Sequence, residues 1–85
     1  MTREETLKRV KSVVSDNFGL DVDRIKEESK LVADFHADDL DCIELIMGIE
    51  EEFGFPIYEE DAEKLTTVGE IVDLVMKKLT EPPFP

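Results

Sequence analysis

The side chains best suited to metal binding or other chemistry lie close together in the sequence, before position 43. Asp34, His36, Asp38 and Asp39 place one imidazole beside three carboxylates, a set that can hold a divalent cation loosely. The spacing lacks the alternating oxygen ligands, central glycine and distal glutamate of an EF-hand loop. We therefore predict no dedicated metal site, and an acidic cation-binding helical protein remains one alternative function.

Other reactive arrangements are missing from the sequence. It holds no Ser-His-Asp set, glycine-rich phosphate loop or zinc-ligand spacing. The single cysteine, Cys42, stands one helical turn beyond Asp39, and nearby carboxylates raise the pKa of a thiol and lower its reactivity. The sequence therefore predicts a protein that is not an enzyme.

Asp38, Asp39 and Cys42 lie at the start of a helix that we predict from Asp38 or Asp39 to about Phe53. Asp38 suits the N-cap, and the acids of the first turn suit the helix dipole. Gly48 costs about 1 kcal/mol relative to alanine inside a helix, which either close packing or simple tolerance explains. At 100° per residue, one group of apolar side chains suits a core: Cys42, Leu45, Ile46, Ile49 and Phe53.

A second apolar group on the same helix falls on a different side. Leu40, Ile43 and Met47 are interleaved there with glutamates. Apolar residues ringed by one sign of charge are typical of a docking surface for a basic partner. We call this predicted docking surface the acidic strip. Helical spacing gives it Leu40, Ile43, Glu44, Met47, Glu50 and Glu51, and a family resemblance given below adds Asp38 and Asp41.

The charge distribution favours the same interpretation. The formal net charge is −12, from 22 acidic and 10 basic residues. Twelve acids and no Lys or Arg lie between Leu31 and Glu63, whereas seven of the bases lie at or before Lys30. Such a surface repels nucleic acid and anionic membranes and favours proteins that present Lys and Arg.

Two further long helices are predicted. Thr2 and Glu5 have the spacing of a capping box, and apolar residues then recur at helical spacing up to a stop at Gly19, which predicts a helix over 3–17. A second capping-box pair, Thr67 and Glu70, opens a helix over 68–79. Between them we expect a long first loop over 19–37 with a turn near 23–25, and one or two helical turns over 59–64.

The whole pattern predicts an all-α protein, a small four-helix bundle of three main helices and one short helix. We expect a single domain over 1–80 and a Pro-rich C-terminal tail over 81–85. No run approaches the roughly 20 apolar residues of a membrane span. One cysteine and an N-terminus without signal or transit features favour the cytoplasm, or the lumen of an organelle after processing. We expect a monomer.

Residues 37–53 resemble the recognition helix of the acyl carrier protein family, whose pattern is Asp-Ser-Leu followed by an acidic, apolar helix. The corresponding residues here are Asp38-Asp39-Leu40-Asp41. The likeness covers residues 3–79. Its most specific part is residues 37–53, and residues 62–68 also fit the family's pattern. It implies the same bundle and long first loop, and a 4′-phosphopantetheine arm on the family's serine. It also implies docking of the acidic strip onto enzymes of fatty-acid or polyketide synthesis and a carrier-protein transferase.

The resemblance further implies an acyl chain sheltered inside the bundle, for which Leu45, Ile46, Ile49, Ile71 and Val75 are reasonable lining residues, although each also suits an ordinary core. Three departures stand out. Asp39 occupies the position of the attachment serine, Phe35-His36 replaces the usual Leu-Gly, and Pro56 precedes the usual proline position, which Tyr58 holds here. The loop before Asp38 is therefore expected to bend differently.

Asp39 decides the chemistry that the resemblance implies. Arm attachment needs an oxygen that attacks the β-phosphate of coenzyme A, and serine gives a stable phosphodiester. A carboxylate is a weak nucleophile that repels the pyrophosphate, and its product would be a hydrolysable acyl phosphate. We therefore predict no cofactor on the chain as written. Natural loss of the serine and an engineered change both remain open.

Two main functions follow. The first is an acyl carrier protein of fatty-acid biosynthesis or related acyl metabolism that Asp39 makes unable to take the arm. The second is an arm-less, carrier-like module that binds partners through the acidic strip. Restoring serine at position 39 distinguishes the two.

Overall fold

The first helix begins and ends at the predicted signals. In a computed structural model, which describes residues 1–80, α1 spans Arg3–Phe18. The Thr2 hydroxyl accepts the Glu5 N–H at 3.1 Å and the Glu5 carboxylate accepts the Thr2 N–H at 2.9 Å. Gly19 ends the helix in the left-handed conformation, with φ 65°. The capping box and the stop are confirmed.

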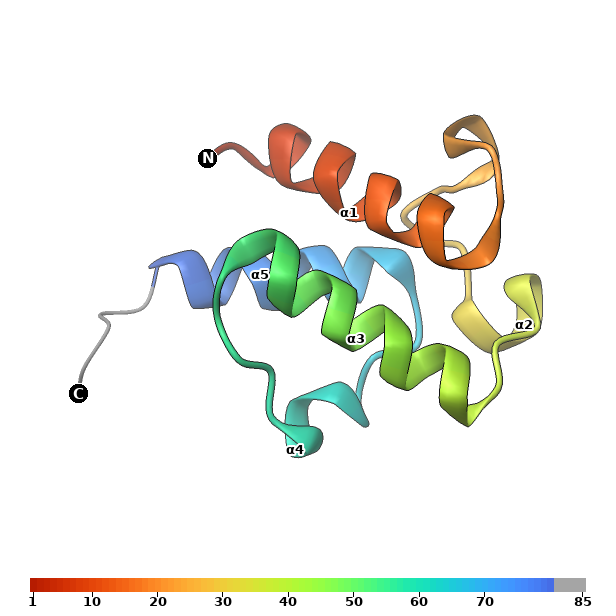
Figure 1. Cartoon of the computed structure of the whole chain (residues 1–85). Coiled ribbons are helices and arrows are strands. Elements are labelled where there is room, and N and C mark those ends of the chain that lie inside the picture. The colour runs from red at the N-terminus through yellow and green to blue at the C-terminus, as the bar shows by residue number, and fades with distance from the viewer. Residues whose placement is uncertain (81–85) are drawn as a thin grey trace.

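The other two long helices also form where periodicity and caps predict them. Helix α3 spans Asp39–Phe53 and α5 spans Val68–Thr80. Thr67 and Glu70 exchange the hydrogen bonds of a capping box at the start of α5. The short predicted helix is α4, Glu59–Ala62. Figure 1 shows α1, α3 and α5 as the body of the bundle, with α4 beside α3.

The long first loop contains more helix than the sequence predicts. A 3-10 turn, η1 (Val22–Arg24), confirms the turn expected near 23–25. A further helix, α2, spans Leu31–Phe35 and was not predicted, because five residues are too few to show a helical period. The Asp34 carboxylate accepts the N–H of Lys30, the residue that precedes this helix, at 2.6 Å. His36 ends it with φ 58°, a conformation that glycine adopts more easily.

Backbone hydrogen bonds hold the long loop against the segment before α5. Gly69 donates to Glu27 at 2.8 Å, Val68 donates to Ser29 at 3.1 Å, and Leu31 donates to Thr66 at 3.0 Å. Ile25 is fully buried under this contact. The loop is therefore pinned by main-chain pairing as well as by its apolar side chains.

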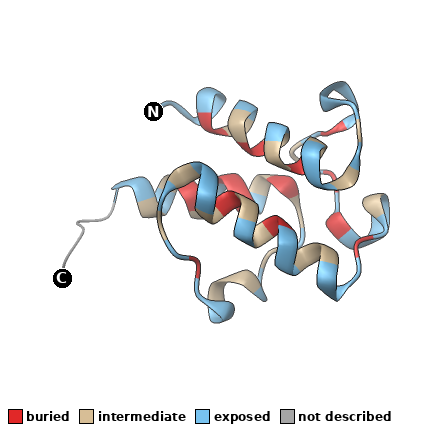
Figure 2. Ribbon diagram, in the orientation of Figure 1, coloured by how far each residue is buried: buried red, intermediate tan, exposed pale blue. Residues whose placement is uncertain are grey.

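The core lies where α1, α3 and α5 face one another, as Figure 2 shows. Its fully buried apolar side chains come from all three helices and the loop: Val10, Val14, Ile25, Leu45, Ile49, Val68, Ile71, Val72 and Val75. The small all-α bundle is thus confirmed. The domain boundary at residue 80 stays a prediction, and the expected tail at 81–85 lies outside the described residues. Within residues 1–80, no helix is long and apolar enough to cross a membrane.

Candidate functional site

The apolar members of the acidic strip point away from the core. Leu40, Ile43 and Met47 are 61%, 57% and 55% exposed, respectively. On the other side of α3, Leu45 and Ile49 are fully buried, and Cys42, Ile46 and Phe53 pack partly buried against the core. The two predicted faces of α3 are confirmed, so large apolar side chains stand in solvent within an acidic surface.

The acids of the strip differ in what they contact. Asp38 and Asp41 form the capping box of α3: the Asp41 N–H donates to Asp38 Oδ1 at 2.8 Å and the Asp38 N–H donates to Asp41 Oδ2 at 3.1 Å. Glu50 accepts the N–H of Ile57 at 2.8 Å. The side chains of Glu44 and Glu51 are exposed and make no hydrogen bond or ion pair within residues 1–80.

The formal charge gathers on one part of the fold. Acids and bases balance in residues 1–30 and again in residues 64–85, so the whole net charge of −12 belongs to residues 31–63. These residues form α2, α3 and α4. Because α4 lies beside α3 (Figure 1), the acids of two helices produce one negative side of the molecule.

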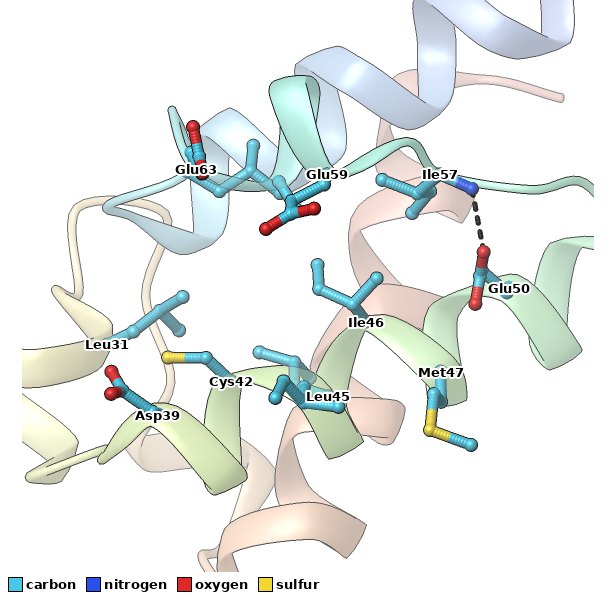
Figure 3. A pocket seen from close by; sticks show the side chains of 13 residues that line it. Leu31, Asp39, Cys42, Leu45, Ile46, Met47, Glu50, Ile57, Glu59 and Glu63 are labelled. Atoms are coloured by element: carbon cyan, nitrogen blue, oxygen red, sulfur yellow. Dashed lines mark hydrogen bonds between the residues drawn. The ribbon is translucent and has the colours of Figure 1, made fainter.

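A groove of about 720 Å³ runs between α3 and the segment that carries α4. Figure 3 shows Leu31, Asp39 and Cys42 at one end, and Met47, Glu50 and Ile57 at the other. Its walls are mostly apolar, and four carboxylates line it with no Lys or Arg. The lining residues are Leu31, Asp39, Cys42, Ile43, Leu45, Ile46, Met47, Glu50, Ile57, Glu59, Ala62, Glu63 and Leu65.

The sequence located this groove only in part. Of the five residues expected to line a chain-binding cavity, Leu45 and Ile46 line the groove. The other three, Ile49, Ile71 and Val75, lie in the core and do not line it. The missed wall residues, Ile57, Ala62 and Leu65, follow the break at Gly54-Phe55-Pro56, where no periodicity assigns them a face.

Asp39 is the first residue of α3 and lies exposed on the rim of the groove. Cys42 lies one turn further along, half-buried in the wall. Burial raises the pKa of the Cys42 thiol, and the carboxylates of Asp39, Asp41 and Asp38 raise this pKa further. The predicted direction is confirmed, although burial, which the sequence argument omitted, is the larger cause.

The acids around His36 do not converge on one point. The Asp34 carboxylate accepts the Lys30 N–H before α2, and Asp38 is the N-cap of α3. In residues 1–80 there is no group of three or more His, Cys, Asp or Glu side chains placed to hold a metal ion. The cation-binding alternative therefore has no preformed site in this part of the chain.

Known proteins match nearly the whole chain. The family model described as "Phosphopantetheine attachment site" matches residues 8–75. An acyl carrier protein of Thermotoga maritima is 45% identical over 78 residues, 92% of this chain and 96% of the relative. An acyl carrier protein of Thermosynechococcus vestitus is 42% identical over 93% of this chain and 98% of the relative, and one of Rubrobacter xylanophilus is 44% identical over 94% and 99%. The family consists of carriers rather than enzymes. The family match over residues 8–75, the matching length and these identities together mean that the chain belongs to the acyl carrier protein family.

Proposed function

We propose that this chain is an acyl carrier protein of fatty-acid biosynthesis or related acyl metabolism that takes no arm as written. The exposed strip on α3 carries the proposal. Leu40, Ile43 and Met47 supply apolar contact area, and the surrounding acids attract a partner that presents Lys and Arg. The combination favours fast, salt-sensitive and short-lived complexes, which suit a protein that visits many enzymes.

The groove supports the same function. Its apolar walls and its position beside Asp39 suit an aliphatic chain that is attached near the start of α3. Burial of each methylene group contributes roughly 0.8 kcal/mol, so the groove suits an acyl chain on an arm, which the variant with serine restored at position 39 can carry. The proposed partners are enzymes of fatty-acid or polyketide synthesis and a carrier-protein transferase.

The residue at position 39 does not fit the family's cofactor. A phosphodiester link to 4′-phosphopantetheine needs a hydroxyl, and Asp39 offers a carboxylate. Three of the other hydroxyls are engaged in the fold: Ser29 accepts the Lys26 N–H at 2.9 Å, Thr67 accepts the Glu70 N–H at 3.2 Å, and Ser15 donates to the Leu20 carbonyl. We infer that the chain stays unmodified, and a cytoplasmic location and a monomeric state remain predictions.

Intact mass after incubation with a carrier-protein transferase and coenzyme A tests the proposal. We expect no mass gain for the chain as written or for Asp39→Asn, and the mass of one arm for Asp39→Ser. A gain that maps to Asp39 would contradict the inference about this residue. If Asp39→Ser stays unmodified with several transferases, the second candidate, an arm-less module that docks through the acidic strip, is favoured.

A further inference from the structure

Glu50 connects the two sides of the groove at one of its ends. Figure 3 shows its carboxylate directed from α3 toward the backbone of Ile57. Oε2 of Glu50 accepts the Ile57 N–H at 2.8 Å, and both residues line the groove. The Ile57 residue is only 7% exposed. A side chain that the sequence assigns to partner binding thus holds a wall residue in place.

The segment that Glu50 holds has little structure of its own. It follows Gly54, which is left-handed with φ 77°, and Pro56, which has no N–H to donate. Helix α4 is four residues long and buries none of them. On its far side, Lys78 of α5 lies 3.7 Å from the Asp61 carboxylate and 5.6 Å from the centre of the Tyr58 ring. The Glu50 bond is therefore a direct link from this segment to α3.

We propose that Glu50, by holding Ile57, closes the end of the groove far from Asp39 and so limits the length of the aliphatic chain that the groove accepts. This inference rests on the proposed function, in which the groove is shaped for such a chain. Asp39 and Glu50 lie at opposite ends, and the helix between them rises about 16 Å at 1.5 Å per residue. A chain that enters beside Asp39 meets Ile57 at the far end, where the Glu50 bond keeps the wall closed.

Removal and conservative replacement of the carboxylate have different consequences. Glu50→Ala leaves the Ile57 N–H without its acceptor, so Ile57 and the residues after Pro56 can move outward to admit a longer chain. Glu50→Gln keeps a carbonyl oxygen in the same place and keeps the end closed. Glu60→Ala removes one exposed acid from α4 without changing a lining residue, and it serves as the matched charge control.

The test attaches the chain chemically, so it needs neither a transferase nor coenzyme A. In a Cys42→Ala background, Asp39→Cys supplies a single thiol on the rim. Alkyl methanethiosulfonates from hexyl to hexadecyl react with it: the thiolate attacks the sulfenyl sulfur, a disulfide to the alkyl group forms, and methanesulfinate leaves. The midpoint temperature of thermal unfolding is then measured as a function of the length of the alkyl chain. The measurement is made with Glu50 present and with Glu50→Ala, Glu50→Gln or Glu60→Ala.

With Glu50 present, we expect the midpoint to rise with each added methylene group and then to level off. Glu50→Ala moves that plateau to chains longer by about two carbons or more, because additional methylene groups become buried. Glu50→Gln and Glu60→Ala keep the original plateau. Each variant is compared only with itself across chain lengths, so a uniform change in stability does not affect the result.

An unchanged plateau in Glu50→Ala would overturn the inference, as would an equal shift in Glu60→Ala. The absence of any length dependence with Glu50 present would overturn it as well, since the groove then holds no chain. Arm attachment to Asp39→Ser is measured separately by mass. Failure of the inference and failure of the proposed function therefore give different results.

Discussion

Gly48 lies against Val13 where α3 packs on α1. A β-carbon added at Gly48 would stand 2.9 Å from Val13 Cγ1, whereas carbon atoms of packed side chains lie about 3.5–4.0 Å apart. Valine is branched at Cβ and has little rotational freedom to move that methyl group away. Close packing therefore explains the glycine inside α3, and simple tolerance, the other reading of the sequence, does not.

Gly48→Ala should lower the free energy of unfolding by about 1 kcal/mol, because an overpacking cost of about 1–3 kcal/mol exceeds a helix-propensity gain of about 1 kcal/mol. Urea denaturation measures the change. In a Val13→Ala background the obstructing methyl group is gone, and the same substitution should become stabilising. An equal stabilisation in both backgrounds would mean that the contact has no energetic effect.

His36 is the one non-glycine residue with a positive φ among residues 1–80. The left-handed conformation costs a residue with a β-carbon roughly 1–2 kcal/mol, and glycine avoids most of this. His36→Gly should therefore raise the free energy of unfolding by about 0.5–1 kcal/mol after the extra entropy of glycine in the unfolded chain is subtracted. His36→Ala keeps the β-carbon and should give no such gain. A similar gain from both variants would point to the imidazole as the source of the strain.

The Cys42 thiol should react slowly with iodoacetamide. As pH is raised, its labelling rate should begin to increase at a higher pH than the rate of a free cysteine does. Its pKa is raised first by burial and then by the carboxylates of Asp39, Asp41 and Asp38. Asp39→Asn removes one of these charges, so it should lower the pKa and speed labelling at a fixed mildly alkaline pH. Glu28→Gln, which changes an acid outside this group, should leave the rate unchanged.

The same shift in pKa has a consequence for stability. The folded chain holds the thiol proton more tightly than the unfolded chain, so this stabilisation is complete below the ordinary thiol pKa and is lost as pH rises through the raised value. The free energy of unfolding should fall over that alkaline range, and less so in Cys42→Ala. Identical alkaline profiles for the two proteins would show that Cys42 is not the titrating group.

Local signals account for the part of the fold that the sequence predicts well. The three long helices carry both a helical period and capping residues, such as Thr2 with Glu5, and these act within a few residues along the chain. Helix α2 is too short to show a period. It begins without a side-chain N-cap and ends at a strained histidine, so it carries no clear sequence signal.

The site is predictable on one side only. Leu40, Ile43 and Met47 follow from the period of α3 alone, because they belong to a single helix. The groove depends on how the segment after Pro56 folds back onto α3, which no local pattern encodes. Glu50 illustrates the limit: the period places it among the docking acids, and its contact with Ile57 arises only in the tertiary structure.

Docking should depend on where the negative charge lies and not only on its total. All of the formal net charge belongs to residues 31–63, so the field of the molecule should orient its α3 side toward a basic partner. Glu44→Lys with Glu51→Lys should slow association with a carrier-protein transferase by about tenfold at low salt, with a smaller effect at high salt. Asp16→Lys with Glu28→Lys makes the same change in net charge outside that segment and should slow association much less. Stopped-flow association rates at several salt concentrations compare the two pairs. Equal slowing would mean that total charge governs capture, and that the acidic strip on α3 has no special part in it.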